Sequence, residues 1–277
     1  MATRLPGLLP PLSAAEALEV TAVHSVAGML APGAPLVTVP PFVDPHHTAS
    51  AAAIIGGGSG QIRPGSISLA HRGVLFLDEC PEFKPRVLDA LRQPLESGQV
   101  LVARASGAVS FPARFQLVLA ANPCPCAAAR DVDCRCDPGS RRRYLARLSG
   151  PLLDRVDIRV ELPAVDPVAL GGVDTGEPTV VIAERVAAAR DRAASRWHGT
   201  PWRRNGDVPG PQVRRMWHPD PASAGLLERA LRAGLLTGRG YDRVLRLALT
   251  SADLAGRDRP GQQDVARALA LRGAAPG

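Results

Sequence analysis

A short apolar segment that ends in two acids constrains this chain more than any other feature of its sequence. Val74 to Leu77 is uninterrupted and apolar, and Asp78 and Glu79 follow it directly. Such a run is typical of a strand buried on both faces, as in a parallel sheet covered by helices. Because carboxylates at a strand end can bind Mg²⁺ or orient a water molecule, the segment predicts an acidic site at one edge of a sheet.

Two further segments fit the same sheet. Residues 116–121 form a second apolar strand that ends in Asn122, and residues 157–162 form a third, more amphipathic one. The ends of neighbouring parallel strands meet at one edge, so Asn122 is expected beside the acids, where it could contact a phosphate or an attacking water. The sequence therefore predicts an α/β fold with a parallel sheet.

Helical periodicity and turn residues predict the elements around the sheet. A capping box starting at Ser13 predicts a helix that ends near Gly28. Residues 48–55 and 86–97 predict two more helices. Residues 100–111 predict a hairpin, because two β-prone runs flank a turn near Ser106 and Gly107.

Composition divides the chain into two units. Residues 1–163 contain the predicted strands, and residues 164–178 have the Gly, Pro and Asp content of a linker. Residues 179–277 have the apolar periodicity of an all-helical domain. Its predicted helices cover about 179–196, 222–234, 239–255 and 261–272.

Four of the five cysteines are crowded into the loop after Asn122. They form two pairs with one-residue spacers, Cys124 with Cys126 and Cys134 with Cys136. Four thiolates can bind Zn²⁺ tetrahedrally, although these spacers are shorter than the usual C-x₂₋₄-C. Two redox-active pairs and a loop without a special role are the alternatives. The crowding favours a reducing compartment over a disulfide framework.

Charge and lysine content limit the ligands. The net charge is +7, which favours nucleic acid or an anionic nucleotide as a partner, although genome base composition explains the arginine content equally well. Lys84 is the single lysine and follows the acids, so the chain contains no phosphate loop of the G-x-x-x-x-G-K-[ST] type. No segment approaches the ~18 apolar residues of a membrane span, and we expect a cytoplasmic protein without a membrane partner.

Several polar residues have both a structural and a functional interpretation. Arg155 could pair with its flanking acids, which would contribute little, or reach a phosphate across a subunit interface, which is worth ~10³–10⁵ in rate. Arg239 begins a helix of the second unit and could contact the same phosphate. Arg141 to Arg143 could touch nucleic-acid phosphate or form a solvated helix face. His46 and His47 are expected to make polar contacts in a loop.

Together these motifs resemble the magnesium-chelatase-like branch of the AAA+ ATPases, specifically the YifB/ComM family. The match covers nearly the whole chain. The segments that carry it are Pro45–Thr48, Pro64–Glu79, Pro81–Phe83, Leu88–Gly98, Phe111–Phe115, Asn122–Cys126, Leu148–Asp157 and Arg239–Arg246.

The resemblance implies ATP and Mg²⁺ as ligands, with Asp78 on the metal, and it favours Zn²⁺ at the four cysteines. It also implies a homo-oligomeric ring, expected to be a hexamer, with the 98–113 hairpin pointing toward a central pore. The expected partner is DNA, remodelled by branch migration during natural transformation. The implied roles are Walker B for Asp78 and Glu79, sensor 1 for Asn122, the arginine finger for Arg155, and sensor 2 for Arg239 or, alternatively, Arg243.

Family members carry an N-terminal Lon-protease-like domain and then a phosphate loop, whose Gly-Lys-Thr would directly precede Met1. We therefore expect an AAA+ P-loop-type sheet without its first strand, which would lie between the strand ending at Asn122 and the one near Asp157. Two strand edges would then be unpaired, and ATP hydrolysis by this chain should be weak. The alternatives are a chelatase-type subunit for metal insertion into tetrapyrroles and a non-enzymatic, zinc-stabilised interaction module.

Overall fold

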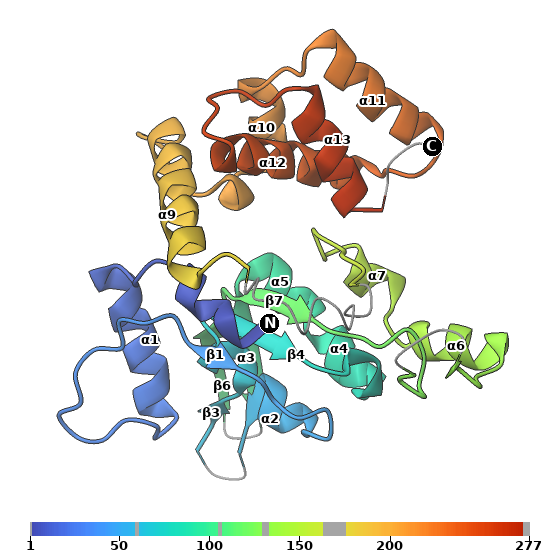
Figure 1. The fold of residues 1–277 in the computed structure, drawn as a ribbon. Coiled ribbons are helices and arrows are strands. Elements are labelled where there is room, and N and C mark those ends of the chain that lie inside the picture. Colours follow the sequence, from blue (N-terminus) through green and yellow to red (C-terminus); the bar gives the residue numbers. More distant parts are fainter. Residues whose placement is uncertain (1, 59–60, 105–106, 129–132, 163–175, 274–277) are drawn as a thin grey trace. The chain divides into compact units, whose positions relative to one another are not determined.

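A three-stranded parallel sheet forms the centre of the first unit (Figure 1). The central strand, β4 (Val74–Leu77), pairs with β1 (Phe42–Val43) on one side and with β7 (Gln116–Leu119) on the other. Leu75 and Leu77 are fully buried. The apolar run therefore forms the doubly covered strand that its sequence predicts.

The computed structural model describes residues 2–58, 61–104, 107–128, 133–162 and 176–273. Contacts divide the chain into two compact units, Met1–Arg155 and Val156–Gly277. Most of the predicted linker, 164–178, lies outside the described residues, so the domain boundaries inferred from composition stay predictions.

One edge of the described sheet is open. Among the described strands, β7 has β4 as its single neighbour, in agreement with the expected gap beside the Asn122 strand. The strand predicted over 157–162 is wrong: the segment has no strand pairing, and Ile158, Val160 and Leu162 are exposed. A strand needs a hydrogen-bonded neighbour, whereas here Arg159 N donates to Leu271 O over 2.6 Å.

The helices of the first unit largely follow the sequence prediction. The capping box of Ser13 and Glu16 starts the first of them as expected. The predicted 86–97 helix is instead two helices, because Pro94 lacks an N–H and its ring clashes with the carbonyl of Ala90, where the first one ends. The helices are α1 (Ala14–Val26), α2 (Ala51–Ile55), α3 (Ser66–Leu69), α4 (Pro85–Ala90), α5 (Arg92–Ser97), α6 (Pro138–Leu145) and α7 (Gly150–Leu153).

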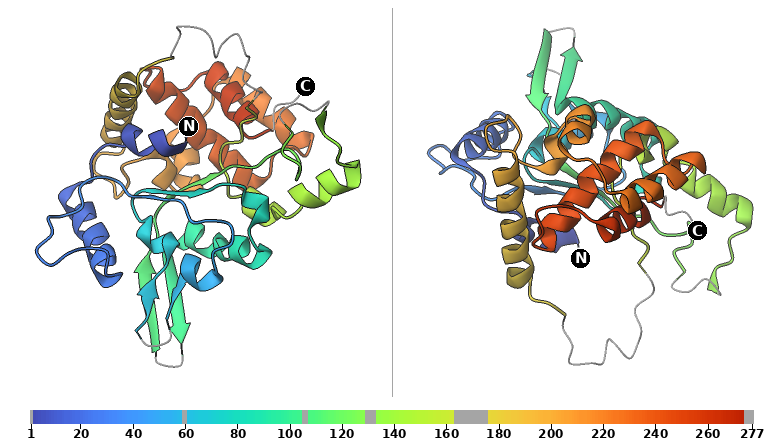
Figure 2. Two further views of the ribbon diagram at one scale, coloured as in Figure 1. Left: turned by 60° about the horizontal axis from the view of Figure 1, so that its bottom comes forward. Right: turned by 90° about the horizontal axis from the view of Figure 1, so that it is seen from above.

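A two-stranded hairpin projects from the first unit in both views of Figure 2. Its antiparallel strands are β5 (Gln99–Arg104) and β6 (Gly107–Pro112), which confirms the predicted hairpin. Val100 and Val102 are buried and Leu101 is exposed, as the two-residue period of a strand requires. Its orientation toward a pore stays a prediction.

Short elements complete the first unit. The extended pair β2 (Gly56–Gly57) and β3 (Arg63–Pro64) forms a second small antiparallel sheet. This unit also contains the 3-10 helices η1 (Ala2–Arg4), η2 (Pro6–Leu8) and η3 (Cys80–Glu82).

The second unit is helical, and the four predicted helices are confirmed. The short helix α10 was not predicted, because its seven residues lie in a connector rich in Pro and Arg. No helix in the described ranges is long and apolar enough to span a membrane. The elements are α9 (Thr179–Arg196), η5 (Asn205–Asp207), α10 (Gly210–Met216), α11 (Pro221–Arg232), α12 (Gly238–Leu254) and α13 (Gln262–Leu271).

A buried polar network ties three of these elements together. Asp253 of α12 is 1% exposed and accepts hydrogen bonds from Arg196 of α9 at 2.5 and 2.8 Å. Asn205 of η5 donates to Asp253 over 2.8 Å and accepts from the indole N–H of Trp197 over 2.9 Å. The buried carboxylate of Asp253 is therefore stabilised by hydrogen bonds from residues of the second unit.

Replacing Asp253 with Ala should destabilise the second unit by about 3–5 kcal/mol, because the charge of Arg196 loses its buried partner. Denaturant unfolding followed by tryptophan fluorescence measures this, since Trp197, Trp202 and Trp217 all lie in the second unit. The exposed Asp191 of α9 supplies the control, Asp191→Ala, with a change within about 0.5 kcal/mol. A loss below about 1 kcal/mol for Asp253→Ala would show that the network is dispensable.

Candidate functional site

The acid pair lies at the carboxyl end of β4, where the sequence predicts it. Asp78 and Glu79 are both exposed. Glu79 has a left-handed backbone with φ 49°, which is uncommon for a residue other than glycine. Its N–H donates to Asp78 Oδ1 over 2.9 Å. The chain thus turns sharply after the strand and leaves both carboxylates at the sheet edge.

Asn122 leaves the sheet at this same edge. Leu77 of β4 lies opposite Leu119 of β7, and Cys80 N donates to Ala120 O over 2.8 Å just beyond the paired residues. Asn122, two residues further on, is half-buried. The structure therefore places Asp78, Glu79 and Asn122 at one edge, as the parallel arrangement predicts.

His47 is a residue of this edge that the sequence analysis did not assign to it. Its Nδ1 lies 3.2 Å from Glu79 Oε2. The ring packs edge-on against Phe83, with 6.4 Å between centroids, and lies tilted by 33° against the His46 ring at 4.1 Å. His47 follows β1, the other neighbour of β4, so the rule that located Asn122 could have located His47 as well.

Arg155 is held within the first unit. One guanidinium nitrogen lies 2.6 Å from Glu96 Oε1 and another 2.6 Å from Pro151 O, and the side chain is 12% exposed. Glu96 belongs to α5 and is distant from Arg155 in sequence, so neither interpretation of Arg155 from the sequence named this partner. To contact a phosphate on another subunit, this side chain would have to leave Glu96.

The two candidate phosphate-binding arginines of the second unit differ in their surroundings. Arg239 is exposed in the first turn of α12, after the capping residue Thr237, as the sequence predicts. Arg243, one turn further along, forms an ion pair with Asp157 and has a side chain that is 21% exposed. The guanidinium of Arg243 thus has a carboxylate partner within the second unit.

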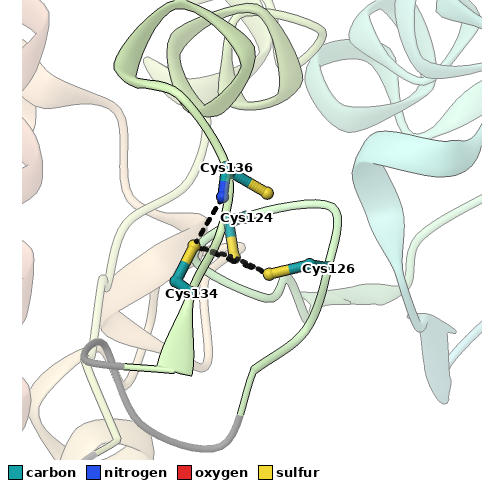
Figure 3. Close-up of side chains that lie close together, drawn as sticks. All are labelled: Cys124, Cys126, Cys134 and Cys136. Atoms are coloured by element: carbon teal, nitrogen blue, oxygen red, sulfur yellow. Dashed lines mark hydrogen bonds between the residues drawn. The ribbon is translucent and has the colours of Figure 1, made fainter.

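The four clustered cysteines converge as a metal site would require (Figure 3). Their sulfur atoms all lie within 4.8 Å of one another. The separations are 3.2 Å for Cys124 and Cys126, 3.5 Å for Cys126 and Cys134, and 3.4 Å for Cys134 and Cys124. Zn–S bonds of ~2.3 Å in a tetrahedron imply S···S edges of about 3.8 Å. Small side-chain movements would therefore accommodate the ion.

The thiols shift one another's pKa values in opposite directions. A hydrogen bond from Cys124 lowers the pKa of Cys126 to about 6, and Arg141 is the main cause of the lowered pKa of Cys134. Hydrogen bonds to Cys126 raise the pKa of Cys124 and, to about 11, that of Cys136. A soft cation bound by all four would displace the remaining thiol protons.

Cys80 does not belong to this cluster. It is buried beneath the acid edge, and burial raises its pKa to about 12. It therefore stays a thiol and packs as a small buried residue.

A parallel sheet with an acid edge, followed by a helical unit, defines an AAA+-like α/β core with a helical domain. The family model described as magnesium chelatase, subunit ChlI, matches residues 1–170. The model of the subunit ChlI C-terminal region matches residues 176–272.

Whole-chain similarity narrows this class. The chain is 56% identical over 272 residues to an uncharacterised protein of Mycobacterium tuberculosis, covering 98% of this chain and 54% of the relative. It is 42% identical to YifB of Escherichia coli and 41% identical to the competence protein ComM of Haemophilus influenzae, again over 98% of this chain and 53% and 52% of the relatives. The chain belongs to the magnesium-chelatase-like YifB/ComM family, and it spans about half the length of these curated relatives.

The contact between His47 and Glu79 is directly measurable. Replacing Glu79 with Ala should move the His47 ring ¹⁵N resonances in long-range ¹H–¹⁵N spectra, because the carboxylate is the partner of Nδ1. Glu228→Ala is the matched control, since Glu228 pairs with Arg232 within α11. His47 signals that stay in place in Glu79→Ala would contradict the contact.

Proposed function

We propose that this chain is the catalytic core of an AAA+ ATPase that remodels DNA. The observation that carries the proposal is the edge formed by Asp78, Glu79 and Asn122 at the ends of two paired parallel strands. Carboxylate oxygens are the ligands that Mg²⁺ prefers, so Asp78 fits the metal of a bound nucleotide. That ion would neutralise charge on the phosphates, Glu79 would orient and deprotonate the attacking water, and Asn122 would contact the terminal phosphate.

Further roles in this proposal fall to arginines. Arg155 would act across the interface of a homo-oligomeric ring, proposed to be a hexamer, after exchanging Glu96 for a phosphate. Arg239, in the first turn of α12, is proposed as sensor 2, and Arg243, which pairs with Asp157, is the alternative. DNA as the partner is supported by the similarity to a competence protein and by the net charge of +7.

The rival function is a chelatase-type ATPase subunit. The name of the matching family supports it. The similarity to YifB and ComM along 98% of the chain favours the DNA-related function. A non-enzymatic interaction module would need the metal site but not the acid edge.

ATP turnover tests the acid edge. The 277-residue chain alone should hydrolyse ATP weakly, because its one lysine, Lys84, follows the acids. Fusing a YifB segment that ends in the family's Gly-Lys-Thr to Met1 should give DNA-stimulated turnover. Glu79→Gln should then reduce this turnover by about 10²-fold or more, whereas Glu228→Gln, in an exposed i,i+4 pair with Arg232 of α11, should leave it nearly unchanged.

Two outcomes would contradict the ATPase proposal or its premise. A fused chain that binds ATP without hydrolysing it would exclude the ATPase role. Turnover by the 277-residue chain alone that Glu79→Gln abolishes would show that the missing lysine is not required.

We also propose that the cysteine cluster binds Zn²⁺, because tetrathiolate sites of this size suit that ion. Elemental analysis of protein purified without chelators should give about one zinc per chain. The double variant Cys126→Ser, Cys134→Ser should lose the metal, and Cys80→Ser should retain it. Metal-free wild-type protein with oxidised cysteines would instead favour two redox pairs.

A further inference from the structure

The cysteine cluster leads directly into α6. Cys136 precedes Asp137, whose carboxylate caps the helix by accepting hydrogen bonds from Ser140 N at 2.9 Å and Ser140 Oγ at 2.5 Å. The position of Cys136 therefore fixes where α6 begins. A helix of eight residues is not stable in isolation, so its order depends on what holds its ends.

Apolar packing contributes little to holding this helix. Tyr144 is its single buried residue, and Arg141 to Arg143 occupy the middle of it. Burial of one aromatic ring is a modest contribution against the conformational entropy of an ordered eight-residue segment. The polar contacts at the two ends must therefore supply much of the remaining stabilisation.

The far end of α6 is fastened to the turn that follows the acids. Arg147 donates to Pro81 O at 3.1 Å and to Glu82 Oε2 at 3.0 Å, and its guanidinium lies 6.0 Å from the Tyr144 ring centroid. Pro81 and Glu82 belong to η3 (Cys80–Glu82), which begins immediately after Glu79. A displacement of α6 would release this turn.

These contacts close a circuit around the candidate catalytic edge. From Asn122 the chain reaches the cysteines, passes through α6 to Arg147, and returns through Glu82 to Cys80. Cys80 N is in turn bonded to Ala120 O at 2.8 Å, two residues before Asn122. Within this series of contacts, the cysteine cluster is held by S–H hydrogen bonds, which are weak. A cation bound by the four sulfurs would replace them with stronger bonds.

We propose that a metal ion bound by the four cysteines acts as a clamp on the acid edge. By fixing the start of α6, the ion holds Arg147 on Glu82 and thereby orders η3 and the adjoining Glu79. Loss of the ion frees α6 and loosens that turn. The clamp rests on the proposed zinc site but not on ATP hydrolysis, and it makes metal occupancy a control on the geometry of Glu79.

Hydrogen–deuterium exchange of the whole 277-residue chain tests the clamp, with zinc content measured in parallel. Removing zinc with a chelator under reducing conditions should speed exchange by about tenfold in peptides covering 137–147 and 80–83. Peptides from α11 and α12 in the second unit should be unchanged. Re-adding ZnCl₂ should restore the slow exchange in both segments.

Arg147→Ala separates the clamp from the metal site. It should retain zinc while exchange at 80–83 becomes fast with zinc bound. Arg143→Ala is the matched control, because Arg143 contacts Ser140 within α6 and not η3. It should leave exchange at 80–83 slow.

Failure of the clamp and failure of the zinc site give different results. Protein that never holds zinc would overturn the metal assignment. Protein that holds zinc and exchanges equally at 80–83 with and without it would overturn the clamp alone. Exchange at 80–83 that is unaffected by Arg147→Ala would also overturn the clamp.

Discussion

The pairing of β4 on both sides is the constraint on which the candidate site depends. A strand flanked by two others has its backbone groups satisfied within the sheet and can be apolar throughout. Polar residues are then excluded until the strand ends, which is where Asp78 and Glu79 occur. Its neighbours deliver further groups to the same edge: His47 follows β1 and Asn122 follows β7. The four apolar residues of β4 thus determine where the polar groups of the candidate site lie.

Both apolar and polar contacts attach the described residues between Asn122 and Arg155 to that core, because Leu152 is buried in it and Leu148 packs against it. The cysteine cluster starts this segment, and Arg147 with Glu82, Ser149 with Asp89, and Arg155 with Glu96 then fasten it in turn. The exposed ion pairs among these contacts are individually weak, so the burial of Leu152 is what fixes the end of the segment to the core.

Much of the fold could be predicted from local patterns. The capping box at Ser13, the hairpin over 100–111 and the helices of the second unit all rest on interactions within a few residues. The errors have local and non-local causes. The break before Pro94 was readable from the proline itself, but the absence of strand pairing over 157–162 depends on whether a neighbour is available. Asn122 was located by sheet geometry, and His47 was missed because the short β1 was not predicted.

The sequence by itself determined the apolar strand with its acids, the paired cysteines, the position of the single lysine and the family resemblance. These follow from residue type and spacing along the chain. The tertiary structure decided which groups meet: His47 with Glu79, Arg155 with Glu96, and four sulfurs within 4.8 Å. Periodicity and capping act over one or two turns, whereas contacts between residues tens of positions apart exist only once the elements have packed.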